Sequence, residues 1–307
     1  MTACAYQTVD VFTSTRFGGN PLAVVPDARG LSDAAMQRIA REFNYSESTF
    51  VLPPDDPTNT VRVRIFTPTA EIPFAGHPNV GTGFVIARQG HAFGNRLGDS
   101  LRFEELAGIV DIEIMRDAGQ VLGARITAPE PFSRGPELGL GPDLVAECAS
   151  LTASDLILRN HPPVLVSVGL PFVVCEVPDL ATLARSTPDM SAFREANAHI
   201  PSQEGGLSLF VYTVLSKEPV TVQARMFAPL DNVPEDPATG SASGALGGLL
   251  ALLRAEPDLD FAMTIQQGYE MGRPSRIEVS VAKRGGEVVQ VKVSGHCVAV
   301  MAGTIEI

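Results

Sequence analysis

The 307-residue sequence contains no tryptophan and only four tyrosines. Proteins that bind single-stranded nucleic acid stack bases on such aromatic side chains, so this class of protein is not expected. The sequence also has no run of lysine or arginine, and its formal net charge is −12. An acidic chain of this kind is repelled by nucleic acid and by anionic membrane surfaces, so we expect neither as a partner.

Long hydrophobic runs are absent too. The longest uncharged apolar run, residues 242–253, is shorter than the roughly 20 residues that cross a bilayer as a helix. Residues 1–11 have no basic stretch before an apolar core, so we expect no signal peptide. The cysteines lack paired spacing, which predicts free thiols and a cytoplasmic protein; they are Cys4, Cys148, Cys175 and Cys297.

Several common motifs of cofactor sites are missing. There is no Walker A sequence, and Gly81 and Gly83 are not followed by the third glycine of a dinucleotide fingerprint. Residues 240–244 do not form the G-x-S-x-G of a serine hydrolase, because Ala242 occupies the serine position. The histidines never occur at H-x-x-x-H spacing, and no lysine lies in a recognisable pyridoxal context. We therefore expect no metal and no cofactor.

What the sequence does contain is a polar stretch, residues 235–244, that leads into the uncharged segment 245–253. Asp before a helix and Pro at its first position are both favoured, so we predict Asp236 as the N-cap and Pro237 as the first helical residue. A helix that is apolar on every side is buried. Its N-terminus would offer N–H groups and a positive dipole end to an anionic ligand. A capped core helix without a ligand is the alternative.

The same pattern occurs twice in the chain. Matching residues differ by 161 positions, as 225 − 64 and 244 − 83 show, and no gap is needed. A repeat of this length indicates a duplicated domain, not a solenoid. The second buried helix would run from Pro78 to Gly90, with its polar start facing that of the first helix across a cleft. The pairs are Arg64 and Arg225, Phe66 and Phe227, Pro68 and Pro229, Pro73 and Pro234, and Gly83 and Gly244.

Alternating strands, hairpin turns and one buried helix per half predict an α+β fold. We expect two similar domains from an internal duplication, each a curved, mostly antiparallel sheet around a central helix. The N-terminal domain is placed at residues 1–128 and the C-terminal domain at 129–297. The last strand, 298–307, is the segment that could return to the N-terminal domain. A segment rich in Pro and Gly, 129–142, is the expected linker.

The remaining polar residues support proton chemistry. His77 and Asp236 each lie at the start of a predicted buried helix, which favours a functional role over a structural one. Glu47 lies in a predicted connection, residues 45–48, where a solvated loop carboxylate is the alternative. An anion between the two helix starts would be bound by N–H groups and side chains of Gly76, His77, Gly240 and Ser241, with the Thr239 hydroxyl available beside them.

Several of these segments carry a family resemblance. In the right order, and over nearly the whole chain, they resemble the phenazine biosynthesis PhzF-like family; they are residues 10–12, 19–24, 46–51, 74–78 and 235–242. Gln267-Gly268 with residues 272–275 resembles the C-terminal motif of that family. The resemblance implies the diaminopimelate epimerase-like fold with its active site between two similar domains. It also implies cofactor-independent isomerase chemistry, often in a homodimer.

The resemblance also implies roles for individual residues. Glu47 matches the acid/base that moves a proton between carbons of trans-2,3-dihydro-3-hydroxyanthranilate. His77 and Asp236 match residues that complete the proton-transfer network and help bind the substrate. The expected substrate-binding residues are Asn20, Gly76, Thr239, Gly240 and Ser241.

The chain departs from its relatives at two places. Related epimerases and proline racemases carry a catalytic cysteine at each helix start, where this chain has Ala75 and Thr239. Racemisation by two thiols is therefore not expected. Asn79 stands where many members of the family have threonine, which leaves the identity of the substrate open.

Three functions compete at this point. The leading expectation is an isomerase that moves a proton on a small carboxylated metabolite, which could be cyclic and carry amino or hydroxyl groups. A binding protein that keeps the cleft without turnover would have no need of a carboxylate at Glu47. An epimerase or lyase on the same scaffold would use Glu47 or His77 alone.

Overall fold

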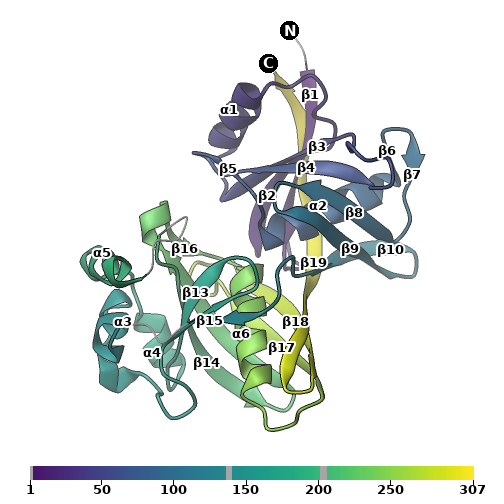
Figure 1. Ribbon diagram of the computed structural model, residues 1–307. Helices are drawn as coiled ribbons and strands as arrows, with labels where there is room; N and C mark the ends of the chain where they lie inside the picture. The colour runs from purple at the N-terminus through teal and green to yellow at the C-terminus, as the bar shows by residue number, and fades with distance from the viewer. Residues whose placement is uncertain (1–2, 136–139, 201–205) are drawn as a thin grey trace. The chain divides into compact units, whose positions relative to one another are not determined.

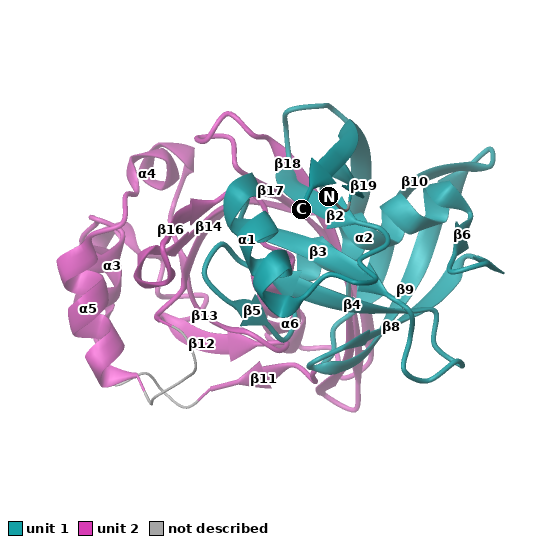
Figure 2. Cartoon of the chain, turned by 90° about the horizontal axis from the view of Figure 1, so that it is seen from above, with its two compact units in different colours: residues 1–129, 292–307 teal, residues 130–291 magenta. Residues whose placement is uncertain are grey.

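A computed structural model describes residues 3–135, 140–200 and 206–307 of the chain. The chain divides into two compact units (Figure 2). Unit 1 consists of residues 1–129 and 292–307, and unit 2 consists of residues 130–291. In these described ranges, no helix is long and apolar enough to cross a membrane.

Unit 1 is built on a sheet that closes on itself. Pairing runs from β1 through β2, β3, β4, β8, β9 and β10 to β19, and β19 pairs again with β1. The β2–β3 and β4–β8 pairs are parallel and the others are antiparallel. The strands are β1 (Ala3–Val11), β2 (Asn20–Val25), β3 (Glu47–Leu52), β4 (Val61–Phe66), β8 (Ser100–Glu105), β9 (Gly108–Asp117), β10 (Gln120–Thr127) and β19 (Glu287–Glu306), with the short strands β5 (Glu71–Ile72), β6 (His91–Ala92) and β7 (Asn95–Arg96).

Helix α2 (Gly76–Gln89) packs against this sheet as its central helix (Figure 1). Residues 76–87 are buried, and the helix contacts β1, β2, β3, β9 and β10. Small residues allow this close packing, because a Cβ at Gly81 would lie 2.5 Å from a Leu22 methyl carbon. The helix ends at Gly90, whose φ of 74° is the left-handed conformation of a helix C-cap.

Helix α1 (Asp33–Phe43) has only one buried face, and it packs on β3 and β4. The Ser32 side chain accepts a hydrogen bond from the Ala35 N–H at the helix start, and Asn44 ends the helix with a φ of 53°. Its apolar face belongs to a buried cluster that comprises Cys4, Val25, Ala28, Met36, Ile39, Ala40, Phe50 and Phe66. The apolar residues at helical spacing in the sequence therefore predict both this helix and the face that it buries.

Unit 2 has strands paired in the order β11, β12, β13, β14, β15, β17, β18. The β13–β14 and β15–β17 pairs are parallel, and β16 pairs with β15. From β12 to β18 the succession of antiparallel and parallel pairs is the same as from β1 to β9 in unit 1. The strands are β11 (Ser133–Arg134), β12 (Val164–Ser167), β13 (Pro171–Glu176), β14 (Leu209–Lys217), β15 (Val220–Ala228), β16 (Val233–Asp236), β17 (Leu259–Gln267) and β18 (Ser275–Arg284).

Helix α6 (Gly240–Leu252) is the buried helix of unit 2 and packs on β12, β13, β17 and β18. The buried Lys283 ammonium donates hydrogen bonds to the carbonyls of Leu252 and Arg254, so a positive charge stabilises the helix C-terminus. A second core lies among the helices that flank the sheet, which are α3 (Pro142–Cys148), α4 (Leu180–Arg185), α5 (Met190–His199) and the 3₁₀ turns Ala153–Asp155 and Pro229–Asp231.

The predicted helix starts need correction. Helix α6 begins at Gly240 with Thr239 as its N-cap, because Asp236 is still a strand residue that pairs with Met226. Helix α2 begins at Gly76, two residues before the predicted Pro78.

The predicted position of Glu47 in a loop was also wrong. Glu47 is the first residue of β3, where it pairs with Leu22 of β2. At the other end of the chain, the predicted last strand, 298–307, is the end of one longer continuous strand, β19. Residues 136–139 of the expected linker lie outside the described residues.

Candidate active site

Unit 1 brings the carboxylate of Glu47 and the imidazole of His77 together. His77 is the second residue of α2, and its Nε2 lies 3.5 Å from Glu47 Oε2. The His77 side chain is 5% exposed and that of Glu47 is 17% exposed. Glu47 Oε2 itself is buried, so the exposed fraction belongs to the rest of the side chain. A carboxylate in such a position can give or take a proton.

The imidazole of His77 is held neutral. Burial lowers its pKa to about 3, although a backbone hydrogen bond with Pro21 acts in the opposite direction. The positive end of the α2 dipole also disfavours a cationic ring, because it repels a positive charge. A neutral imidazole near pH 7 can orient a neighbouring carboxyl group and accept a hydrogen bond, but it does not carry a positive charge.

Asn20 completes this group at the start of β2. The residue is fully buried, and its Nδ2 lies 3.4 Å from His77 Nδ1. The Ser46 hydroxyl donates to Asn20 Oδ1 at 3.5 Å, so the residue before Glu47 is tied to the same group. The pairing of β2 with β3 thus determines that Asn20 and Glu47 flank one imidazole.

The first turn of α2, which contains His77, belongs to the same group of residues. Ala75 is the N-cap and has no side chain to bond the free N–H groups of the turn. Gly76 is the first helical residue and is buried beside His77. The Asn79 side chain donates from Nδ2 to the Ala75 carbonyl at 3.1 Å, which holds the turn in shape. Such a helix start is suited to bind an anionic group.

Unit 2 gathers a second set of predicted residues. The Thr239 hydroxyl donates to Asp236 Oδ2 at 2.5 Å, and Gly240 and Ser241 follow as the first two residues of α6. All four are at least nine-tenths buried or carry no side chain. Unit 2 therefore holds a carboxylate, two hydroxyls and a helix start in one place.

The sequence predictions missed the residue that organises this second set. Gln267 is fully buried and accepts from the Thr239 N–H at 3.0 Å. Its Nε2 donates to the Asp236 carbonyl at 2.8 Å and to Thr239 Oγ1 at 3.0 Å. The signal was present, because Gln267 belongs to the C-terminal motif, but no role could be read from the motif alone.

The rest of that motif supports the segment before α6. The Ser275 hydroxyl donates to the Pro237 carbonyl at 2.9 Å. Gly268 has a φ of 76°, and a Cβ there would lie 2.6 Å from the Pro237 oxygen, so only glycine fits. Residues 267–275 are therefore a support for Asp236 and Thr239.

The comparisons with known proteins identify the family of this chain. A family model described as phenazine biosynthesis-like protein, PhzC-PhzF, matches residues 9–303. The chain belongs to the PhzF-like family. The resemblance inferred from the motifs is thereby confirmed.

Individual relatives of the PhzF-like family match the chain from end to end. An uncharacterized isomerase of Mesorhizobium japonicum is 38% identical, and the match covers 98% of each chain. The trans-2,3-dihydro-3-hydroxyanthranilate isomerase of Pseudomonas fluorescens is 35% identical over 98% of each chain. The crystal structure of a PhzF-family protein from Bacillus anthracis superposes with a TM-score of 0.86 at 26% identity and covers 100% of both chains.

Thiol chemistry is not available at either helix start of this PhzF-like protein. The N-caps of α2 and α6 are Ala75 and Thr239. The cysteines are buried free thiols, and burial raises the pKa of Cys148 and Cys175 to about 12. A thiol with so high a pKa is a poor nucleophile and a poor base at neutral pH. Among the described residues, no three His, Cys, Asp or Glu side chains converge on a point where a metal could sit.

Proposed function

We propose that this protein is a cofactor-independent isomerase that moves a proton between two carbons of a small carboxylated metabolite. The observation that supports this proposal is the contact between the largely buried side chains of Glu47 and His77. Glu47 would take a proton from one carbon as a base and return it to another carbon as an acid. The substrate is rearranged with no net change in protons or electrons, so no second reactant is needed.

Because His77 is neutral, Glu47 is the member of the Glu47–His77 pair that carries the proton. The His77 pKa of about 3 means that the ring does not compete for the proton at neutral pH. Nε2 faces Glu47 Oε2, where it can accept a hydrogen bond from the protonated carboxyl. Glu47 is therefore the proton carrier in this proposal, and His77 orients it and stabilises its acid form.

The unit 2 residues are proposed to bind the polar groups of the substrate. Asp236 and Thr239 offer a carboxylate and a hydroxyl, and Gly240 and Ser241 offer the N–H groups of a helix start. Asn20 and Gly76 of unit 1 are proposed to bind substrate beside Glu47. Relatives that are 35% identical are named trans-2,3-dihydro-3-hydroxyanthranilate isomerase, which favours a cyclic amino and hydroxy acid as the first substrate to test.

Two further features belong to this proposal. The equal succession of strand pairings in units 1 and 2 supports an origin by duplication, with two similar domains around α2 and α6. A homodimer in the cytoplasm is also proposed, from the family resemblance and the free thiols. Light scattering of the purified protein tests the dimer.

Deuterium incorporation from D₂O tests the function. Purified protein is incubated with trans-2,3-dihydro-3-hydroxyanthranilate and with a panel of small carboxylates, and NMR follows exchange at carbon. We expect exchange with at least one compound, and a loss of about 10²–10⁴-fold in turnover for Glu47→Gln, which keeps the shape but cannot shuttle a proton. Glu42→Gln, on the exposed surface of α1, is the matched control.

The outcomes separate the competing functions. Exchange in Glu47→Gln within a few-fold of the wild type would remove Glu47 from the mechanism. Tight binding of a carboxylate without any exchange would indicate a binding protein. Exchange at a single stereocentre, without movement of a double bond, would indicate an epimerase.

A further inference from the structure

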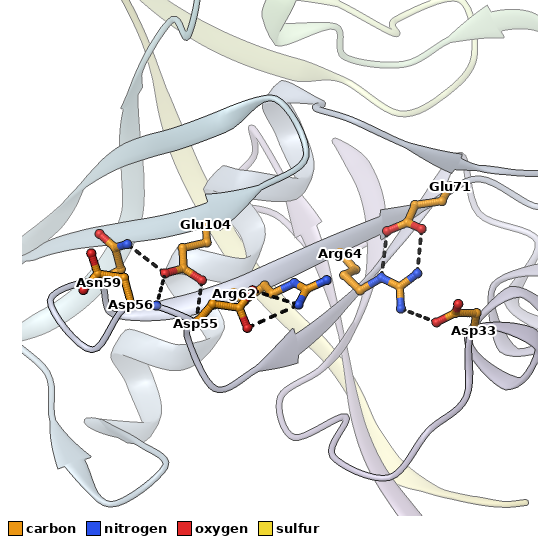
Figure 3. A network of polar contacts seen from close by, with 8 residues as sticks. All are labelled: Asp33, Asp55, Asp56, Asn59, Arg62, Arg64, Glu71 and Glu104. Carbon is orange, nitrogen blue, oxygen red and sulfur yellow. Dashed lines mark hydrogen bonds and ion pairs between the residues drawn. The ribbon is translucent and has the colours of Figure 1, made fainter.

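The outer face of strands β4 and β8 carries charged side chains that form ion pairs and hydrogen bonds with residues beside them (Figure 3). Arg62 forms an ion pair with Asp55 at 3.1 Å. Arg64 is held by two carboxylates, those of Glu71 and Asp33. Glu104 accepts three hydrogen bonds of 2.7–2.8 Å, from the N–H groups of Asp55 and Asp56 and the amide of Asn59.

The next residue, Glu105, is placed differently. Side chains alternate between the two faces of a strand, so Glu105 continues the row of the buried Leu101 and Phe103 on the inner face of β8. Both of its carboxyl oxygens are buried, and neither completes a hydrogen bond among the described residues. A buried carboxylate without a partner is costly, so this group requires an explanation.

Asn79, in the first turn of α2, is the polar group that acts on this carboxyl. Its amide lowers the pKa of Glu105, but burial raises that pKa more, to about 8. Asn79 is itself fully buried, and its Oδ1 also completes no hydrogen bond among the described residues. A proton on Glu105 would provide a donor for Asn79 Oδ1 and would remove the cost of a buried charge.

The same end of β8 is tied to the segment before α2 in two ways. The Ala107 N–H donates to the Pro73 carbonyl at 3.2 Å. Asn79 Nδ2 donates to the Ala75 carbonyl at 3.1 Å. Glu105 is therefore connected through one side chain to the N-cap of the helix whose first two residues are Gly76 and His77.

No described cation faces Glu105 and would hold it ionised. Arg62 and Arg64 of β4 bind their own carboxylates on the outer face, and Arg102 of β8 is exposed there too. Glu104 points to that outer face. His77, in the same turn as Asn79, is buried and neutral. The inner end of β9 contributes the apolar Val110.

We propose that Glu105 is a positioning residue that acts as a neutral carboxylic acid. Its O–H donates to Asn79 Oδ1, which keeps Asn79 Nδ2 on the Ala75 carbonyl and thereby fixes the turn that presents Gly76 and His77. When Glu105 loses its proton it can only accept hydrogen bonds. The hydrogen bond to Asn79 Oδ1 is then lost, Asn79 is held less firmly against the Ala75 carbonyl, and the turn loosens.

NMR of the wild-type protein tests this without any substrate. We expect the Glu105 carboxyl to titrate with a midpoint near pH 8. The backbone amides of residues 75–77 should shift with the same midpoint. Glu105→Gln, which has nearly the same shape and a permanent N–H donor, should abolish the shift of these amides. Glu104→Gln, one residue away on the outer face, should leave the shift unchanged.

Turnover gives the second readout, and this part rests on the proposed function. Wild-type kcat should fall about tenfold one pH unit above the Glu105 midpoint, while Glu105→Gln retains wild-type kcat at pH 7 and does not fall there. Glu105→Leu should lose about 10–10²-fold at pH 7, as expected when a reacting group is misplaced.

A Glu105 carboxyl that titrates in the ordinary range would overturn the proposal, and so would amides of residues 75–77 that do not follow its titration. If the NMR titration appears but no substrate is turned over, the proposed function fails while the positioning role stands.

Discussion

Helix α2 of unit 1 and helix α6 of unit 2 both follow a strand with the motif Arg-x-Phe. Arg64 lies over Phe66 at 5.1 Å and Arg225 lies over Phe227 at 5.0 Å, measured from guanidinium carbon to ring centroid. Each arginine then binds one glutamate through two nitrogens. The chain before each helix is thus held by the same kind of arginine–glutamate ion pair.

The difference lies in the length of chain between arginine and glutamate. Glu71 is seven residues after Arg64 and Glu235 is ten residues after Arg225. Both helices begin five residues after the glutamate, as 76 − 71 and 240 − 235 show. The helix starts therefore differ by 164 positions (240 − 76), and the gapless offset of 161 fails at this point.

Counting from the arginine-bound glutamate changes which residues correspond. His77 corresponds to Ser241 (241 − 77 = 164), and Gly83 corresponds to Gly247 rather than to Gly244. A Cβ at Gly83 would meet Ile112 of β9 at 2.9 Å, and one at Gly247 would meet Val279 of β18 at 2.5 Å. At the second helical position, unit 1 thus has the titratable imidazole of His77 where unit 2 has the hydroxyl of Ser241.

The two arginines should differ in their contribution to stability. The Arg225 side chain is 7% exposed, binds Glu235 and donates to the carbonyls of Leu183, Ala184 and Ser186. Arg225→Leu leaves a nearly buried carboxylate unpaired, and should lower the free energy of unfolding by about 3–5 kcal/mol. Arg64→Leu should cost only about 1–2 kcal/mol, since Asp33 is 81% exposed and Glu71 is 22% exposed. Urea unfolding measures both, and equal losses would contradict the comparison.

The supports behind the two helix starts should differ as well. Gln267→Leu removes three hydrogen bonds, among them the one that the buried Thr239 N–H donates, and should cost about 3 kcal/mol. Asn79→Leu removes the bond to the Ala75 carbonyl and should cost about 1–2 kcal/mol. Gln266→Leu, on the opposite face of β17, is the control in the same denaturation series. A larger loss for Asn79→Leu than for Gln267→Leu would reverse the expected order.

The smallest effect concerns pH, and it separates His77 from its counterpart Ser241. The pKa of His77 is about 3 in the folded protein, and a free histidine has a pKa near 6.5. As the pH falls below about 6.5 the unfolded chain gains a proton that the folded protein does not, so stability is lost. At pH 5 the wild type should lose about 2 kcal/mol relative to His77→Gln, compared with pH 8. Ser241→Ala should show no such dependence on pH when unfolding is followed at both values.

Much of the candidate site could be predicted from local patterns. His77 and Gly76 at one helix start, and Gly240 and Ser241 at the other, follow from glycine-rich turns before uncharged helical segments. The grouping of His77 with Asn20 and Glu47 could not be read locally, because it depends on the pairing of β2 with β3. Gln267 was missed for the same reason, since a buried amide on a strand has no local signature of what it binds.

The sequence by itself determined that α2 and α6 are buried, because α6 carries no charged residue and α2 carries only Arg88, in its last turn, and helices that are apolar on every side are buried. It also determined the amphipathic helix α1, the unpaired cysteines and the membership of the PhzF-like family. Only the tertiary structure decided where the two helices begin, that Glu47 lies on a strand beside His77, and that Glu105 turns inward to Asn79. These features depend on register between strands far apart in the sequence, and a shift of one residue in that register would reverse which side chains point inward.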